Sequence, residues 1–442
     1  MRKFVSKQIL DIKSYGIQEL FRKFFLLISL TRYLVIITLD IIAILPCLII
    51  RLISPWLIIR IQKLPAESFG SFAAAPALYY CKKKLNIDQP TKKCIDLIYV
   101  PYNHQFCNKQ LIKMWKRRFN FLSPYLLDPI FRVNKIFPGF KNHEIKILET
   151  ESDRDINNLL QKCQPILEFT DEEEIEGKKI LSKFGLKDKD KFVCFAIRDR
   201  AYDLMRVLPR FRDWSYHDYR YNNIDNYILA AEELTKRGYY VFRMGVVVEE
   251  RFNSNNPKII DYANSNHRSD FMDIYLGAKC SFCISTQFGA LALYELFDKP
   301  IAQVSIPLAA SHTHNENSLF ITQHHILKKE KRKLSLSEIF SHSLAYAFNT
   351  KIFKERDVEL VENTPEEIKD LALELENYFE SKKESTNEDK KLQKIFKDLF
   401  VANYKLSNPV KNSNPYWKSH IHGKIRSCYG AKFLRENRDW LK

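Results

Sequence analysis

Four turns in this chain each follow a short apolar run of β-forming residues, and three of these turns carry residue types that hold phosphate and ribose oxygens. An arginine can grip a diphosphate through two parallel hydrogen bonds. Hydroxyl groups and free backbone N–H groups at the start of a helix also favour a phosphate. A nucleotide-type ligand is therefore the first hypothesis. The residues predicted to bind it are Arg198, Arg243, Gly245, Ser285, Thr286, Gly289 and Glu295.

The apolar runs alternate with helical stretches, and this alternation predicts a parallel sheet with right-handed crossovers. The loops that leave the carboxyl ends of such strands lie along one edge of the sheet, where ligands bind. The sequence therefore predicts that the four turns share one edge. The predicted strands, each given with its turn, are 192–197 with 198–200, 239–242 with 243–245, 282–284 with 285–289, and 300–304 with 305–307.

Arg198 and Asp199 directly follow the first of these strands, so both side chains should point at the ligand edge. Arg198 there would stabilise the charge of a departing diphosphate. An ion pair between Arg198 and a loop aspartate is the alternative interpretation. His217 lies beside Asp218 in the long loop 199–223, and the pair suits general-base catalysis, although a loop histidine is more often an ordinary surface residue. The predicted catalytic residues are Arg198, Asp199 and His217.

Three further assignments have alternatives. His104 and His143 are other candidate bases in the first half of the chain. A Ser-Thr pair before a helix, as at Ser285, is usually only a helix cap. Glu295 would reach a ribose from the following helix, but a solvated glutamate has the same sequence pattern.

Several enzyme classes lose support from motifs that the sequence lacks. It contains no Gly-x-x-x-x-Gly-Lys, Gly-x-Ser-x-Gly or Gly-x-Gly-x-x-Gly, which disfavours P-loop NTPases, serine hydrolases and dinucleotide oxidoreductases. The histidine pairs 312/314, 324/325 and 420/422 have no carboxylate or cysteine partner at ligand spacing. Cys280 and Cys283 form a Cys-x-x-Cys pair of the kind found in zinc sites, but the residues around them are typical of the start of a buried strand. We therefore expect no metal site and no cofactor.

Length, composition and charge suggest a two-domain globular protein. The chain has 442 residues, too many for one ordinary core, with 45% hydrophobic and 28% charged residues. The net charge of +17 is spread along the chain without a recognition motif, so nucleic acid is not an expected partner. Nine cysteines without a spacing framework favour a reducing compartment.

Residues 24–61 are almost entirely apolar and are flanked by basic residues on both sides. Asp40 and Pro46 interrupt this run, and a mid-helix aspartate costs about 2.5–3.5 kcal/mol on insertion scales. A single span is possible, but positive charge at both ends favours a helical hairpin or an interfacial anchor with both ends on the cytoplasmic face. A buried helical pair in a soluble domain is the alternative.

Several segments carry a resemblance to a known family, namely Phe69–Ala73, Tyr216–Arg220, Ile224–Tyr227, Lys236–Gly245, Asp270–Leu276 and Phe282–Thr286. Together they resemble a bacterial family of candidate glycosyltransferases with GT-B-like architecture, over about residues 64–378. Two positions depart from that family, which usually has histidine at Ser71 and a glycine-rich turn at Gln287-Phe288. More distantly, the strand followed by arginine is similar to the donor site of fucosyltransferases, which implies Arg198 as a diphosphate ligand.

The resemblance implies an α/β fold of two Rossmann-like domains that face each other across a cleft, after an N-terminal apolar membrane-associated helical segment. The expected parts are residues 1–63 (membrane-associating), 64–167 (acceptor domain, with Gly70 and His104 on the acceptor side), 168–382 (nucleotide-sugar domain) and 383–442 (charged linker, loose at 384–391, then a basic segment). The expected activity is metal-independent transfer of a sugar from a nucleoside-diphosphate sugar to a lipid-linked or surface-glycan acceptor, at the cytoplasmic face of a bacterial inner membrane. A membrane-surface scaffold without catalysis, and a pyruvyl or phosphosugar transferase, remain alternatives.

Overall fold

The computed structural model describes residues 2–64, 66–102, 106–145, 155, 157–207, 215–308, 315–345, 347, 349–380, 385–406 and 425–442. The chain divides into two compact units, and neither is a continuous stretch of sequence. Unit 1 comprises Met1–Pro65, Pro90–His104 and Phe119–Lys146, and unit 2 comprises Ala66–Gln89, Gln105–Arg118 and Ile147–Lys442. The expected domain boundaries at 63/64, 167/168 and 382/383 do not coincide with this division and stay a prediction.

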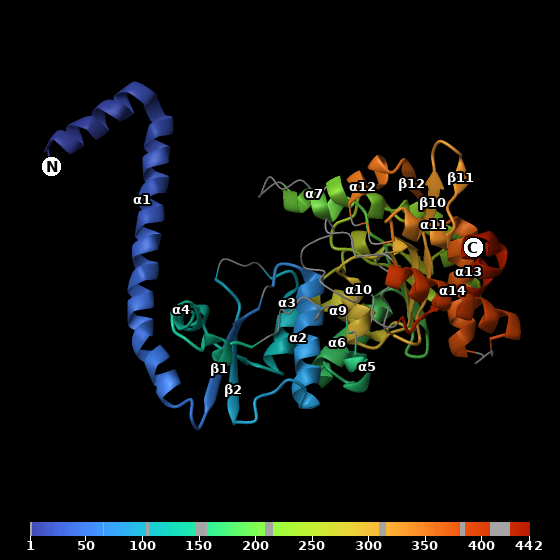
Figure 1. Ribbon diagram of the computed structural model, residues 1–442, viewed down its shortest axis with the longest axis horizontal. Helices are drawn as coiled ribbons and strands as arrows, with labels where there is room; N and C mark the ends of the chain where they lie inside the picture. Colours follow the sequence, from blue (N-terminus) through green and yellow to red (C-terminus); the bar gives the residue numbers. More distant parts are fainter. Residues whose placement is uncertain are drawn as a thin grey trace. The chain divides into compact units, whose positions relative to one another are not determined.

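Unit 1 combines a long helix with a three-stranded parallel sheet in the order β1-β2-β3. In Figure 1, α4 runs beside the C-terminal part of α1. Apolar residues of the two helices form a shared core, with Cys47 of α1 packed among Leu127, Ile130 and Phe131 of α4. The elements are α1 (Arg2–Leu52), β1 (Ile58–Lys63), β2 (Cys94–Tyr99), β3 (Asn120–Phe121), α4 (Pro124–Asn134) and η1 (Phe140–His143).

The N-terminal apolar segment is one helix, so the helical-hairpin interpretation was wrong. α1 continues through Pro46 without a break to Leu52. Its part Phe21–Leu52 is long and apolar enough to cross a membrane by length and composition.

Unit 2 contains a seven-stranded sheet in the order β13-β9-β8-β7-β4-β5-β6, in which every pair is parallel. From β4 the chain adds β5 and β6 on one side, and it then returns to add β7, β8 and β9 on the other side. This is the strand order of a doubly wound dinucleotide-binding sheet, with its switch point between β4 and β7. The strands are β4 (Phe192–Ala196), β5 (Tyr240–Arg243), β6 (Ile259–Ile260), β7 (Cys283–Ser285), β8 (Ile301–Ile306), β9 (Leu319–Thr322) and β13 (Cys428–Tyr429).

The helices of unit 2 include those that cross over between these strands. Thr170 and Glu173 form a capping box at the start of α6. The helical elements are α2 (Phe69–Lys84), α3 (Lys109–Lys116), α5 (Leu159–Lys162), α6 (Asp171–Lys183), α7 (Ala201–Val207), η2 (Ser215–Arg220), η3 (Ile224–Tyr227), α8 (Ile228–Lys236), η4 (Tyr262–Asn264), α9 (Asp270–Lys279), α10 (Leu291–Leu296), α11 (Leu336–Ser341), α12 (Thr350–Glu355), α13 (Pro365–Glu380), α14 (Asn387–Leu406), α15 (Ala431–Glu436) and η6 (Arg438–Leu441).

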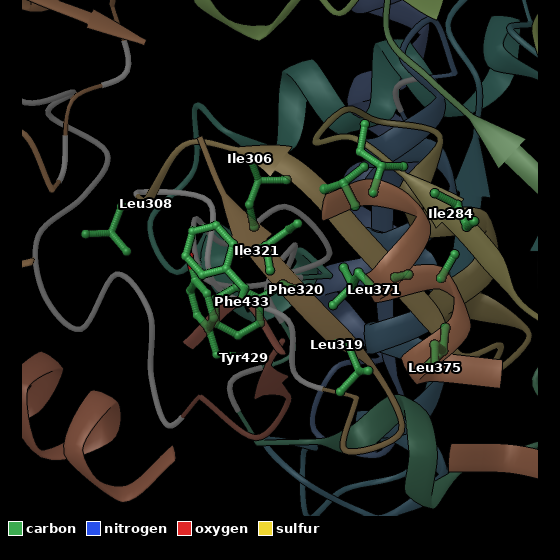
Figure 2. Close-up of a cluster of buried hydrophobic side chains, with 14 of the residues drawn as sticks. Ile284, Ile306, Leu308, Leu319, Phe320, Ile321, Leu371, Leu375, Tyr429 and Phe433 are labelled. Carbon is green, nitrogen blue, oxygen red and sulfur yellow. The ribbon is translucent and has the colours of Figure 1, made fainter. Parts of the chain in front are cut away.

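The core of unit 2 lies against the central strands. Every residue of β8 and β9 is buried, as expected for parallel strands that are covered on both faces. Figure 2 shows side chains of β7, β8, β9 and α13 packed together with Tyr429 and Phe433 from the C-terminal segment. A small antiparallel sheet in the order β11-β10-β12 completes the unit, with β10 (His324–Leu327), β11 (Arg332–Lys333) and β12 (Val358–Val361).

The described C-terminal residues 385–406 and 425–442 belong to the fold, which corrects the expectation of a loose linker at 384–391 from residue 387 onward. Residues 387–391 begin α14, and Phe396 and Phe400 of this helix are buried. Because β13 pairs with β9 and Trp440 lies in the core, the segment seals the edge of the sheet. The parallel α/β sheets are therefore confirmed, whereas the arrangement of two domains across a cleft stays a prediction.

Candidate functional site

The carboxyl ends of β4, β5 and β7 are aligned, so the loops that follow them lie close together. Phe195 of β4 pairs with Arg243 of β5, and Ala196 pairs with Ser285 of β7. Ligands of open α/β sheets bind in the crevice outside the strand ends at the switch point. The ligand edge that the sequence predicted is therefore present in unit 2.

A cavity of about 300 Å³ opens at this edge, and we call it the switch-point cavity. Its polar wall contains Arg198, Asp199, Asp203 and His217. Gly245 and Gly289 also line it, so five residues singled out from the sequence meet here. The apolar wall is formed by Phe69, Met244, Val246, Val247, Val248, Phe288, Leu293 and Tyr294.

A second cavity of about 350 Å³ adjoins the same loops, and we call it the acidic cavity. It shares Ile197 and Asp199 with the switch-point cavity. Three glutamates contribute to its wall, together with two arginines and several amide and aromatic side chains. The lining residues are Ile197, Asp199, Arg200, Tyr221, Asn222, Asn223, Ile224, Arg243, Glu249, Glu250 and Glu362.

Arg198 is held in an ion pair with a loop aspartate, as the alternative interpretation predicted, and the partner is Asp203 of α7. Its guanidinium also lies 5.6 Å from the ring centre of Tyr221, whose hydroxyl donates to Asp203 at 3.1 Å. The Nε atom of Arg198 is buried and has no hydrogen-bond partner among the described residues. A phosphate that binds Arg198 must therefore share this arginine with Asp203 or displace the carboxylate.

Arg243 was expected in the turn after β5 but is the last residue of that strand. Its side chain is only 1% exposed and is paired with Asp261 at 3.3 Å and with Asp199 at 3.5 Å. Burial lowers the pKa of Arg243, although the two carboxylates act in the opposite direction. Its charge is thus balanced within the protein, and its donor-binding role stays a prediction.

Asp199 joins the loops after β4 and β5. One carboxylate oxygen accepts from the Ala201 backbone N–H at 3.0 Å, and the other accepts from the Glu249 N–H at 2.9 Å and from Arg243. These bonds engage both carboxylate oxygens within the protein and hold the two loops together. The catalytic role of Asp199 stays a prediction.

Ser285 and Thr286 are buried and bonded within the sheet edge. Ser285 Oγ lies 3.0 Å from the carbonyl oxygen of Ala196, and the hydroxyl of Thr286 accepts from the backbone N–H of Arg198 at 2.9 Å. Ser285 therefore connects the end of β7 to the end of β4, and Thr286 connects the loops that follow these two strands. Their contact with a phosphate or ribose stays a prediction.

The other predicted residues are distributed unevenly around the site. Gly70, in the first turn of α2, touches the backbone of Gly289. Glu295 lies half-buried in α10 and lines neither cavity. His104 lies outside the described residues. His143 belongs to unit 1, where its ring nitrogen Nδ1 lies 2.9 Å from the Ile59 carbonyl oxygen.

Arg220 is a residue that sequence reasoning missed, although it lies in the segment Tyr216–Arg220 that carries the resemblance. Its guanidinium donates to Gln287 Oε1 at 2.9 Å and contacts His217 Nδ1 at 2.8 Å. Because arginine can only donate, Nδ1 is the acceptor and a neutral His217 carries its proton on Nε2. This tautomer makes neutral His217 a hydrogen-bond donor at Nε2. Asp203 was also missed, and no motif could have indicated it.

The part of the chain that the structure describes contains no cluster of side chains that could hold a metal ion. No group of three or more histidine, cysteine, aspartate or glutamate side chains is suitably placed there. His312, His314, His420 and His422 lie outside the described residues. His324 is bonded instead to Glu367 at 2.9 Å.

Comparison with known proteins gives only weak likenesses. No protein-family model and no curated protein matches the chain. Among solved structures, a glycosyl transferase family 9 protein of Veillonella parvula is 11% identical with a TM-score of 0.39, over 72% of this chain and 97% of that chain. ADP-heptose LPS heptosyltransferase II of E. coli is 12% identical with a TM-score of 0.26, over 55% and 84%. The UDP complex of S. aureus MnaA is 10% identical with a TM-score of 0.22, over 56% and 79%.

The first two proteins are named as glycosyltransferases, which is the class to which the sequence resemblance also points. With TM-scores below 0.5, however, these likenesses establish neither a shared fold nor a shared activity.

Proposed function

We propose that this chain is a glycosyltransferase that moves a sugar from a nucleoside-diphosphate sugar to a glycan or lipid-linked acceptor. The observation that supports this most is the switch-point cavity, which combines Arg198 with an apolar wall at the carboxyl edge of a doubly wound sheet. A nucleoside-diphosphate sugar has matching parts, a flat base for the apolar wall and two phosphates for the arginine. The volume of about 300 Å³ lies at the lower end of the range for small-ligand sites.

Arg198 has the central chemical role in this proposal. Breaking the bond between sugar and diphosphate leaves negative charge on the departing phosphate, and a guanidinium already in place stabilises it without reorganisation. Arg198 supplies the cation that a metal supplies in other transferases. Donor binding comes before this step, and it replaces the contact between Arg198 and Asp203 with a contact between Arg198 and phosphate.

Other residues hold Arg198 and the donor in position. Thr286 fixes the backbone of Arg198, while Asp199 and Arg243 connect the loops after β4 and β5. Gly245, Ser285, Gly289 and Glu295 remain the other proposed donor-binding residues. The tautomer imposed by Arg220 favours His217 as a donor to a phosphate or sugar oxygen over His217 as the general base.

The acceptor assignment rests on the N-terminal part of the chain. Gly70 and His104 are the proposed acceptor-side residues, and the exposed apolar part of α1 would keep the enzyme at the cytoplasmic face of a bacterial inner membrane. Lipid-linked intermediates of polysaccharide or lipopolysaccharide assembly are the acceptors that fit such a location.

Thermal melting of the full chain with a panel of nucleotide sugars tests the proposal. UDP-, GDP-, TDP- and ADP-sugars are compared with the matching nucleoside monophosphates and with phosphoenolpyruvate. We expect one nucleotide class to raise the melting temperature and to be slowly hydrolysed, because ligands that bind only the folded state stabilise it. Protection by phosphoenolpyruvate alone would favour a pyruvyl transferase. Protection by no compound would favour a non-enzymatic scaffold.

A further inference from the structure

The apolar part of α1 poses a choice between crossing a bilayer and lying along its surface. Phe21–Leu52 has 32 residues, which is about 48 Å of helix and more than the ~30 Å hydrocarbon core of a membrane. Only 11% of its most apolar window is buried within the protein. Length and composition therefore permit both orientations, and the contacts of α1 within unit 1 decide between them.

Three polar residues tie α1 to the rest of unit 1. Arg32 donates to the hydroxyl of Tyr102 at 3.1 Å, and Asp40 pairs with Arg132 of α4 at 2.6 Å. Arg51 donates to the Pro138 carbonyl oxygen at 2.7 Å. From Arg32 to Arg51 the helix rises about 29 Å, which is nearly the full thickness of a hydrocarbon core.

The contact between α1 and α4 also contains charge that a bilayer interior would not tolerate. Arg132 bonds to Asp128 as well as to Asp40, and Tyr99 donates to Asp128 at 2.7 Å. Burial lowers the pKa of Arg132, but the two carboxylates outweigh it and the pKa is raised, so the group stays charged. The side chains of Arg132 and Asp40 remain 34% and 31% exposed, which in a membrane would be exposure to lipid.

A crossing orientation would leave too little helix for the membrane. If unit 1 stays in water, only the residues before Arg32 are available, and the apolar run Phe24–Thr31 is about 12 Å long. If the whole apolar part of α1 entered the bilayer, the irregular backbone of unit 1 next to Arg51 would enter with it, and such backbone does not occur in contact with lipid.

The surface of α1 that faces away from α4 fits a bilayer interface. The residues of α1 that contact α4, such as Asp40, Ala43 and Cys47, recur on one side of the helix. At 3.6 residues per turn, the exposed apolar residues of the opposite side span about 120° of the circumference, wider than the seam by which one helix packs on another. Exposed residues on this surface include Leu34, Ile41, Ile42, Leu45, Leu48, Ile49 and Leu52.

Aromatic residues next to Arg32, at one end of the contact between α1 and the rest of unit 1, are of the kind found at the depth of lipid headgroups. Tyr102 and Tyr125 stack with ring centres 5.8 Å apart, and Arg32 lies 5.6 Å from the Tyr102 ring centre. Tyr125 and its neighbour Leu126 of α4 are 65% and 53% exposed. Tyrosine rings with an adjacent cation are typical of the membrane–water interface.

We infer that α1 does not cross the membrane but lies in the plane of its cytoplasmic interface, with the surface opposite α4 in contact with the acyl chains. The chain is thus a monotopic protein whose N-terminus and catalytic unit are on the same side. This inference is independent of which reaction the enzyme performs.

Protease accessibility of the full chain with an epitope tag at each end tests the orientation. In cytoplasmic-side-out membrane vesicles both tags should be cleaved, and in intact spheroplasts both should be protected. A crossing helix would expose the N-terminal tag in spheroplasts and protect it in the vesicles, which would overturn the inference.

A double substitution on the exposed surface tests the contact itself. Ile41→Asp with Leu45→Asp places two charges at positions that are 62% and 66% exposed, so folding should be unaffected. We expect at least a tenfold rise in the soluble fraction, because interfacial binding scales with buried apolar area. Ile175→Asp in α6, at an equally exposed position of unit 2, is the matched control and should stay membrane-bound. Unchanged sedimentation of the double variant, or a soluble wild-type chain that self-associates through α1, would contradict the bilayer as partner.

Discussion

The backbones of Gly70 and Gly289 are in contact. A Cβ atom on Gly70 would lie 3.0 Å from the Cα of Gly289, and a Cβ atom on Gly289 would lie 3.1 Å from the backbone nitrogen of Gly70. The first turn of α2 can therefore approach the turn after β7 only because neither residue has a side chain. Through this contact Phe69, directly before Gly70, reaches the wall of the switch-point cavity.

Gly70→Ala should destabilise unit 2. Alanine improves helix propensity by about 1 kcal/mol in α2, but overpacking against backbone costs about 1–3 kcal/mol, so we expect a net loss. Urea unfolding measures the difference. Ser71→Ala in the same helical turn is the control and should change stability little. A Gly70→Ala variant as stable as Ser71→Ala would show that the two segments separate easily.

Arg198→Ala should reduce sugar transfer or donor hydrolysis by about 10²–10³-fold, because it removes the group that faces the departing diphosphate. Arg198→Lys should recover little, since a point charge cannot replace the two-pronged guanidinium. Arg237→Ala is the control, because Arg237 is also ion-paired, with Glu376, but precedes β5 at the opposite edge of the sheet. Turnover above about a tenth of wild type in folded Arg198→Ala would refute the assignment, since the expected loss is at least ~10²-fold.

Asp203→Asn should strengthen binding of a nucleoside diphosphate. The substitution removes the carboxylate that competes with phosphate for Arg198, and we expect about a tenfold lower Kd, or about 1.4 kcal/mol. Isothermal titration calorimetry gives the value. Asp218→Asn changes a carboxylate that lies 3.9 Å from Arg200 and serves as the control. Weaker binding by Asp203→Asn would mean that Asp203 orients Arg198 and does not compete for it.

His325 should make the protein less stable as the pH falls below neutrality. Burial lowers the pKa of this histidine to about 4, whereas it is 6.5 in the unfolded chain. The unfolded state therefore binds more protons between these values, so the contribution of His325 is fully present above pH 6.5 and is lost as the pH falls toward 4. The loss amounts to roughly 3 kcal/mol.

Unfolding free energies measured across this pH range test the prediction. His325→Phe keeps the volume but cannot titrate, so its stability should fall less than that of wild type. His342→Phe, at a more exposed position, should follow wild type. Parallel pH profiles for wild type and His325→Phe would show that His325 is not buried in its neutral form.

Structural features that depend only on neighbouring residues were predictable from the sequence to within a few positions. The start of α6 follows from the sequence, because the hydroxyl of Thr170 precedes four acidic residues and local hydrogen bonds decide such starts. The strand before Arg198 was expected because its residues are apolar throughout, as burial on both faces requires. The carboxyl edge of the sheet, with Arg198 and Gly289 in one cavity, follows from the alternation of strands and helices.

The pairing of charges and the path of α1 were decided by the tertiary structure. Whether Arg243 faces a ligand or the protein depends on a single residue at the end of β5, because successive side chains of a strand point in opposite directions. No motif links Asp261 to Arg243, and Asp203 is one of several aspartates in the loop 199–223 that could pair with Arg198. Asp40 weakens a membrane span when α1 is considered alone, but in the folded chain it binds Arg132 of α4. Sequence periodicity describes a helix by itself, whereas the partner of a charge is set by contacts between segments distant in the chain.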